Sequence, residues 1–148
     1  MSTKNARQFD DQEHRLLAIW ASDCAEHTLS YFEKMYVNDD RPRKAVEAAR
    51  AWARGDLAML DARKAAFAAH AAARAANHLA AQAAARAAGH AAATAHVADH
   101  ARHAAAYAVK AAEINGNAAG EESYWQAQRL PERLRRILFP ETTPVHPK

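Results

Sequence analysis

The chain has 148 residues and a formal net charge of +3 at pH 7, and more than a quarter of its residues are alanine. This length fits a single domain, and alanine, which favours helices but buries little apolar area, predicts an all-α protein with a thin core. The positive charge is mild and dispersed along the chain rather than concentrated in a basic stripe, which argues against a nucleic-acid-binding protein.

The composition also bears on the cellular setting. No stretch of about 18 apolar residues lacks charged residues or histidine, so we expect no helix that spans a membrane. The N-terminal segment is polar and does not resemble a secretory signal. The single cysteine, Cys24, excludes a framework of internal disulfides. Together these features predict a cytoplasmic protein.

The first predicted helix begins at Asp10 or Asp11, because acidic residues favour helix N-termini. It ends by Asn38, with a bend near Ser22 or Thr28. Its apolar and polar side chains recur at spacings of three and four residues, as on one face of a helix.

The second predicted helix runs from Pro42, which suits a first helical turn, to Arg54 and ends at Gly55. Arg41 and Arg43 near its N-terminus are candidate ligands for an anion, because backbone N–H groups and the helix dipole favour negative charge there. The alternative is that both arginines are solvated beside a helix cap.

The segment 61–115 contains no proline and one glycine, Gly89. As a single helix it would be about 80 Å long at about 1.5 Å per residue, too long for a compact domain of this size. We therefore predict a break at 76–78, where an asparagine tolerates a left-handed conformation, with helices over 61–75 and 79–113. Gly89 is a second candidate for a break, or a position that allows close packing.

A turn is predicted at 115–117, followed by a short helix over 121–129 and a last helix over 131–138. The predicted architecture is a compact bundle of about five to seven alanine-rich helices. It forms one domain over 1–140, and we expect 141–148 to be a disordered tail.

Nine histidines are present, six of them between residues 70 and 103. On the long predicted helix, side chains at spacings of four, three and four residues share one face: His96, His100, His103 and Tyr107. His90 and Thr94 lie on an adjoining face. Asp99 precedes His103 by four residues and can pair with it.

Two histidines at i and i+4 on a helix can chelate one transition-metal ion, and His96 and His100 have this spacing. Cys24 and His27, three residues apart on the first helix, could point to a common atom. If the two pairs met, these four side chains would form a tetrahedral site for zinc or iron. The alternatives are imidazoles that fill a polar seam between alanine faces, and a pocket without metal.

A polar pocket is predicted because buried imidazoles require partners and a helix bundle built only for stability would use leucine. Asp23 precedes His27 by four residues and could orient it for acid–base chemistry. Cys24 beside His27 suggests a thiolate–imidazole pair, or an inert buried cysteine. The candidate pocket residues are Asp23, Cys24, His27, Tyr31, His90, His96, His100 and Tyr107.

Three stretches resemble a bacterial family of immunity proteins: WASDCAEHTL (20–29), DRPRKAVEAARAWARGD (40–56) and RAAGHAAATAHVADHA (86–101). The resemblance covers roughly residues 13–113. It implies a small cytosolic protein that neutralises a partner toxin by direct binding, and it implies no catalytic or metal-binding residues.

Two functions therefore remain open. The resemblance implies a toxin-neutralising immunity protein, although inhibitors of nuclease toxins are often acidic and this chain is basic. The polar residues instead favour a helical protein, possibly an enzyme, that binds a small molecule or metal in an internal pocket. Nucleic-acid binding would require the C-terminal arginines, which are typical of a solvated helix face: Arg129, Arg133, Arg135 and Arg136.

Overall fold

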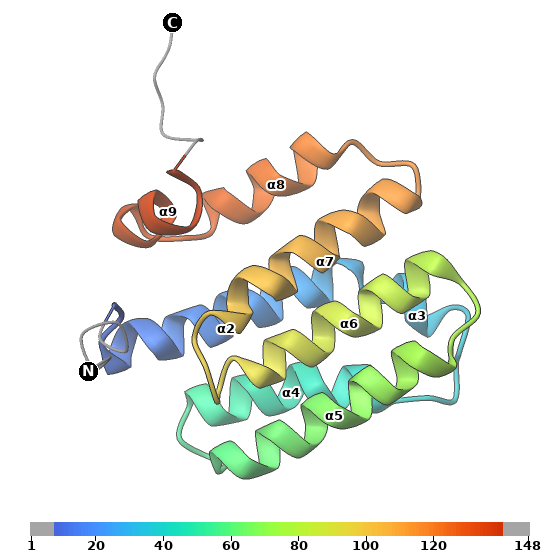
Figure 1. Ribbon diagram of the computed structural model, residues 1–148, viewed down its shortest axis with the longest axis horizontal. Coiled ribbons are helices and arrows are strands. Elements are labelled where there is room, and N and C mark those ends of the chain that lie inside the picture. Colours follow the sequence, from blue (N-terminus) through green and yellow to red (C-terminus); the bar gives the residue numbers. More distant parts are fainter. Residues whose placement is uncertain (1–7, 141–148) are drawn as a thin grey trace, which may run out of the picture.

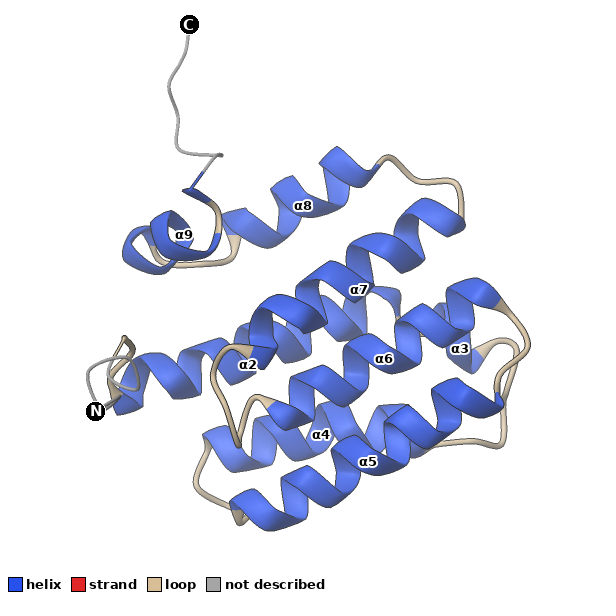
Figure 2. Cartoon of the chain, in the orientation of Figure 1, coloured by secondary structure: helices blue, strands red, loops and turns tan. Residues whose placement is uncertain are grey.

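The computed structural model describes residues 8–140, and within them the chain forms eight helices and no strand (Figure 2). The predicted all-α bundle is confirmed, with slightly more helices than expected. The predicted tail at 141–148 lies outside the described residues. The helices are α2 (Asp11–Thr28), α3 (Ser30–Glu33), α4 (Arg41–Ala53), α5 (Met59–Ala75), α6 (Leu79–Ala93), α7 (His100–Ile114), α8 (Ala119–Gln128) and α9 (Glu132–Leu138).

The helices pack in two layers with a cap. Helices α5, α6 and α7 lie side by side, and α2 and α4 lie behind them (Figure 1). Helices α8 and α9 cover the edge of the bundle formed by α7, so that α8 and α5 lie at opposite edges of the molecule (Figure 1). No helix among the described residues is long and apolar enough to cross a membrane.

Helix α6 is the centre of the bundle, and every buried residue on it is alanine or glycine. Such small side chains let neighbouring helix backbones approach closely, which suits a helix that contacts α2, α4, α5 and α7. Gly89 lies inside α6 and does not break it. A Cβ atom at this position would lie 2.7 Å from two atoms of the His70 ring, so the glycine permits close packing against α5.

Larger apolar side chains fill the core around this alanine centre. They come from the two ends of the chain and are almost fully buried: Leu17, Trp20, Leu29, Phe32, Leu130 and Leu134. The sequence-based expectation of a thin, alanine-lined core is consistent with this distribution.

Helix α2 begins where predicted. The Asp10 side chain accepts a hydrogen bond from the backbone N–H of Glu13, and the Glu13 side chain accepts one from the N–H of Asp10. This reciprocal capping box satisfies two donors that the first turn leaves unpaired. Helix α2 ends at Thr28, one of the two predicted positions for a bend, and the short α3 ends at Glu33, before the predicted limit at Asn38.

The predicted break at 76–78 is confirmed, because Ala76 and His78 have extended backbones. The single helix predicted over 79–113 is wrong, since a second break at 94–99 separates α6 from α7. A hydrogen bond from a distant residue favours this break. The His14 Nε2–H donates to the Thr94 carbonyl at 2.6 Å and takes up an acceptor that the next helical turn would use. The Thr94 hydroxyl donates to the His90 carbonyl beside the helical bond from the Thr94 N–H.

Candidate functional site

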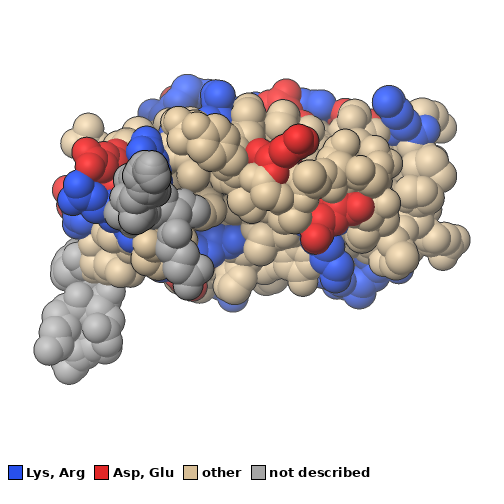
Figure 3. Space-filling view, turned by 90° about the horizontal axis from the view of Figure 1, so that it is seen from above, with Lys and Arg blue, Asp and Glu red and all other residues tan. Residues whose placement is uncertain are grey.

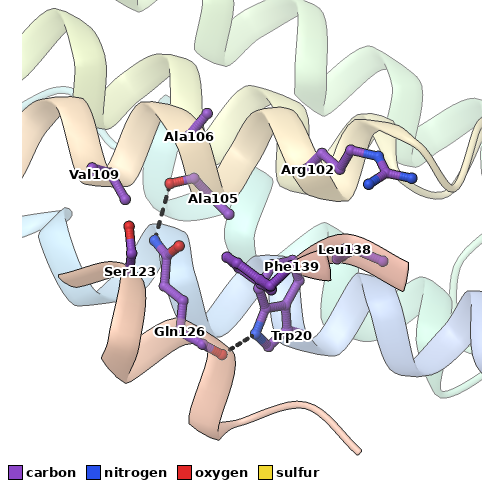
Figure 4. A pocket seen from close by; sticks show the side chains of 9 residues that line it. All are labelled: Trp20, Arg102, Ala105, Ala106, Val109, Ser123, Gln126, Leu138 and Phe139. Carbon is purple, nitrogen blue, oxygen red and sulfur yellow. Dashed lines mark hydrogen bonds between the residues drawn. The ribbon is translucent and has the colours of Figure 1, made fainter. Parts of the chain in front are cut away.

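Helix α8 is attached to the bundle by one face. The side-chain amide of Gln126 donates to the Ala105 carbonyl of α7 at 2.9 Å, and the Trp20 indole N–H donates to the Gln126 carbonyl at 2.8 Å (Figure 4). Both Trp20 and Gln126 are buried, so these bonds fix the position of α8 against α7 and α2.

The opposite face of α8 is open to solvent and rich in aromatic and polar side chains. Five residues share this face, and we name them the α8 ridge: Glu121, Tyr124, Trp125, Gln128 and Arg129. Neighbouring members of the α8 ridge are three, one, three and one residues apart along the chain. Tyr124 is 67% exposed. The α8 ridge therefore presents large side chains on a helix whose inner face holds it in place.

Trp125 is held in position by its neighbours. Its ring stacks on His27 of α2 with centroids 3.6 Å apart and planes 9° apart, and the Arg129 guanidinium lies 4.8 Å from its centroid. The His27 Nδ1–H donates to the buried Glu122 carboxylate at 2.7 Å, which orients the imidazole. These contacts pre-arrange Trp125 and limit the side-chain entropy that would be lost on binding.

A charged hollow of about 300 Å³ lies on the Trp125 side of α8. Arg50 of α4 donates to Asp23 at 2.9 Å and to Glu26 at 2.6 Å, and Arg129 approaches Asp23 at 3.7 Å. The hydrogen bond from Arg50 is the largest cause that lowers the pKa of Glu26, although burial opposes it. The hollow thus contains fixed, paired charges of both signs.

A second hollow, of about 350 Å³, lies on the other side of α8, between α7 and α9 (Figure 4). Its walls are mainly apolar: Trp20, Ala105, Ala106, Val109, Leu138 and Phe139. The Trp20 and Phe139 rings meet edge to face at 5.9 Å. The α8 ridge is therefore flanked by a charged hollow on one side and an apolar hollow on the other.

The face that carries α8 is mostly neither acidic nor basic. Figure 3, which views the molecule from this side, shows separate acidic and basic patches on a largely uncharged surface. A nucleic-acid-binding surface would instead show a continuous basic stripe. Charge on this face fits a protein partner better than a nucleic acid.

The predicted histidine constellation forms only in part. His90 of α6 lies within 5.3 Å of three rings of α7, measured between centroids: His100, His103 and Tyr107. The Nδ1 atoms of His90 and His100 share a hydrogen bond of 3.0 Å. The prediction that His96 shares a helix face with His100 is wrong, because His96 lies in the break before α7 and is exposed.

Sequence reasoning missed His70 of α5, which joins this cluster from the other side. Its ring centroid lies 4.9 Å from that of His90, and its Nδ1 accepts a hydrogen bond from Arg86 at 3.0 Å. We name His70, His90, His100 and His103 the histidine cluster. No periodicity within one helix could reveal it, because its members come from three helices.

The imidazoles at the centre of the histidine cluster have low pKa values. Burial, followed by the positive charge of Arg86, lowers the pKa of His70 to about 4. Burial, followed by the neighbouring histidines, lowers the pKa of His90 to about 3, and burial also lowers the pKa of His100. These rings are therefore neutral at neutral pH.

The proposed zinc or iron site is not formed. Cys24 is fully buried in the core, and burial raises the pKa of its thiol well above the usual value. His27 lies beside Trp125, while His100 lies in the histidine cluster and His96 is exposed. Within residues 8–140, no group of three or more His, Cys, Asp or Glu side chains is arranged to hold a metal ion.

The residues of the single predicted pocket likewise lie at separate places in the structure. Asp23 and His27 line the charged hollow, but Asp23 pairs with arginines and Glu122 orients His27 instead. The Tyr31 hydroxyl accepts a hydrogen bond from the Asn117 amide at 2.9 Å. The raised pKa of the Cys24 thiol disfavours the thiolate–imidazole pair.

The predicted anion site at Arg41 and Arg43 is also not formed, because carboxylates already neutralise both side chains. Arg41 donates through two nitrogens to Asp39. Arg43 donates to Glu33 and to Glu26.

Sequence reasoning also missed Glu122 and Trp125. The adjacent aromatics Tyr124 and Trp125, followed at helical spacing by Arg129, were the available signal, since Tyr, Trp and Arg are enriched where proteins bind each other.

Comparison with known proteins identifies the family. No curated protein and no solved structure matches the chain. A family model described as Imm-5 like putative immunity protein matches residues 7–133, which include the whole of α2 to α8. This match spans most of the chain, and the protein therefore belongs to the Imm-5-like family of putative immunity proteins.

Proposed function

We propose that this protein neutralises a partner toxin by binding it directly, and that the α8 ridge is the centre of the binding surface. Family membership supports the general role. The single observation that supports the location is the pre-arranged set of Tyr124, Trp125 and Arg129 on the outer face of α8, in which Tyr124 and Arg129 are exposed and Trp125 is partly buried.

The composition of the α8 ridge fits a binding hot spot. Most of the energy of a protein–protein interface comes from a few residues, and Trp, Tyr and Arg are the commonest among them. Trp125 is stacked on His27 and lies near Arg129, so it loses little freedom when a partner covers it. A partner would therefore meet large, rigid anchors rather than flexible side chains.

The two hollows beside α8 extend this surface. The apolar hollow can accept an apolar side chain of the toxin, and the charged hollow offers Asp23, Glu26 and Arg50 for polar contacts. The charges are already paired within the protein, so they would define orientation more than they add affinity. This arrangement differs from a purely acidic decoy of a nucleic-acid substrate.

Co-expression with a toxin encoded next to this protein tests the proposal. We expect the unaltered protein to rescue growth and the triple variant Tyr124→Ala, Trp125→Ala, Arg129→Ala to lose most of the rescue. Circular dichroism of the purified variant checks that its helices persist.

Helix α5 offers a matched control at the opposite edge of the molecule (Figure 1). Phe67 is 59% exposed, and the Arg63 guanidinium lies 5.5 Å from its ring. The double variant Arg63→Ala, Phe67→Ala also removes an exposed aromatic and a neighbouring cation, and it should retain full rescue. Equal loss in both variants, or full rescue by the α8 variant, would contradict the proposed surface.

A further inference from the structure

A groove between α6 and α7 differs from the surfaces described so far. It encloses about 200 Å³ and has both polar and apolar walls. We name it the α6/α7 groove, lined by Leu79, Gln82, Ala83, Arg86, Tyr107, Lys110 and Ile114.

Within residues 8–140, the two cations of this groove have no carboxylate partner, and one of them is partly buried. Among the described residues, Arg63 and Lys64 also lack an ion pair, but both are exposed, whereas Arg86 is partly buried. Among the described residues, eight arginines form ion pairs with carboxylates: Arg41, Arg43, Arg50, Arg54, Arg102, Arg129, Arg133 and Arg136. In that same part of the chain, neither Arg86 nor Lys110 has a carboxylate within ion-pair distance. Positive charge in the α6/α7 groove is therefore uncompensated.

Arg86 is half-buried and donates one hydrogen bond, to the neutral ring of His70 at 3.0 Å. A guanidinium has five N–H donors in a planar fork, so most of them remain available for an oxyanion. Because partly buried charges are normally paired, an unpaired guanidinium in a concave site favours an anionic ligand.

Tyr107 forms one wall of the groove beside Lys110. Its ring lies parallel to His90, with centroids 5.3 Å apart and planes 8° apart, and the Lys110 ammonium lies 6.0 Å from its centroid. Leu79 and Ile114 add apolar surface and are 66% and 41% exposed. The groove therefore combines positive charge with a flat aromatic and aliphatic wall.

We propose that the α6/α7 groove binds a small molecule in which an oxyanion, phosphate or carboxylate, is attached to an apolar or aromatic group. Arg86 forms paired hydrogen bonds with the oxyanion, and Lys110 supplies a second positive charge. The apolar group lies against Tyr107, Leu79 and Ile114. This site is separate from the α8 ridge, and the inference does not depend on toxin binding.

Binding of simple probes to the intact protein tests this proposal. Phenyl phosphate, inorganic phosphate, benzoate and acetate are titrated into isotope-labelled protein at constant ionic strength, and amide and imidazole shifts are followed by NMR. We expect saturable shifts confined to α6, α7 and His70, at roughly millimolar or lower concentrations. The aromatic probes should bind more tightly than their inorganic or aliphatic counterparts.

The comparison of the phosphate probes with the carboxylate probes distinguishes the possible sources of the oxyanion. Tighter binding of phenyl phosphate than of benzoate assigns a phosphate ester, and the reverse order assigns a carboxylate. Either order supports the site. Shifts that do not saturate, or that spread evenly over the surface, would overturn the proposal.

Variants locate the site. The double variant Arg86→Gln, Lys110→Met should weaken probe binding at least tenfold. Because Arg86 also contacts His70, the single variant Lys110→Met serves as a second test that leaves this contact intact, and it should weaken binding severalfold. Unchanged affinity in both variants would refute the assignment.

Helix α5 again provides the control. Arg63 and Lys64 line another hollow together with Leu60 and Phe67, but that hollow also contains Asp61. The double variant Arg63→Gln, Lys64→Met removes the same number and types of charge and should leave probe binding unchanged. Equal weakening in this control would show that only net charge matters, and it would overturn the proposal.

Discussion

The α8 ridge and the α6/α7 groove both contain aromatic and cationic side chains, but they use them differently. On the α8 side, Arg129 lies beside Trp125 and also approaches Asp23 at 3.7 Å, so its charge is balanced within the protein. In the α6/α7 groove, Arg86 bonds to a neutral imidazole and its charge is not balanced. Balanced charges beside exposed aromatics suit a large protein partner, whereas an unbalanced charge in a hollow suits a small anion.

The largest effect is expected from removing the anchor of α8. Trp20 is buried and its indole N–H donates to Gln126, so Trp20→Ala leaves a cavity and an unpaired carbonyl. We expect a loss of about 3–5 kcal/mol in the free energy of unfolding, measured by urea denaturation. Trp52, which is only partly buried on α4, is the control, and Trp52→Ala should cost less than half as much. Equal losses would show that α8 does not depend on this anchor.

Acidification should act on the histidine cluster, which contacts Arg86 and Tyr107 of the α6/α7 groove. His70 and His90 have folded-state pKa values of about 4 and about 3, lower than the ordinary value of 6.5. The unfolded chain therefore binds more protons, and stability falls as the pH drops through about 6.5 towards 4. If the whole pKa shift of each ring contributed, lowering the pH from 7 to 5 would reduce the free energy of unfolding by about 2 kcal/mol for each ring. Because both rings are only partly buried and solvent screens part of the shift, we expect about 2 kcal/mol for the pair.

Urea denaturation at pH 7 and pH 5 measures this loss, and the double variant His70→Gln, His90→Gln should remove most of it. The Glu26 carboxylate of the charged hollow loses its stabilising ion pairs only at a pH below this range, because hydrogen bonds from Arg50 and Arg43 lower its pKa from 4.5. A pH dependence that is the same in the variant would contradict a role for these two imidazoles.

A smaller change in stability is expected from replacing two glycines by alanine, one in α6 and one in α8. Gly89→Ala places a Cβ atom 2.7 Å from the His70 ring, so the ring must move, and we expect a loss of about 1 kcal/mol despite the better helix propensity of alanine. At Gly120 in α8 nothing lies within 4 Å of the added Cβ atom. There alanine should stabilise the protein by about 0.5–1 kcal/mol. Thermal unfolding of the two variants should therefore shift in opposite directions, and shifts of the same sign would contradict close packing at Gly89.

Local chemistry in the sequence was sufficient to place most helices. Gly55 and Gly116 have φ values of 85° and 96° at the ends of α4 and α7, where their position after a helical stretch predicted turns. The break at 94–99 could not be predicted in this way. It depends on a hydrogen bond from His14 to Thr94, two residues that lie 80 positions apart in the chain.

This missed break explains the errors at the candidate sites. With α6 and α7 joined, His96 and His100 would share a helix face and could chelate a metal ion. With the chain turned back at 94–99, His100 instead faces His90, and α5 contributes His70. The α8 ridge was missed for a different reason, because local periodicity cannot tell whether Trp125 faces a core or solvent.

The most direct test of the account is the affinity of a neighbour-encoded toxin for two single variants, measured by calorimetry. Trp125→Ala on the α8 ridge should weaken binding by about 30-fold, or about 2 kcal/mol, as expected for a central hot spot. Phe67→Ala removes an aromatic that is 59% exposed at the opposite edge, and it should leave the affinity within about twofold. If Phe67→Ala weakens binding and Trp125→Ala does not, the toxin binds elsewhere and the central claim is contradicted.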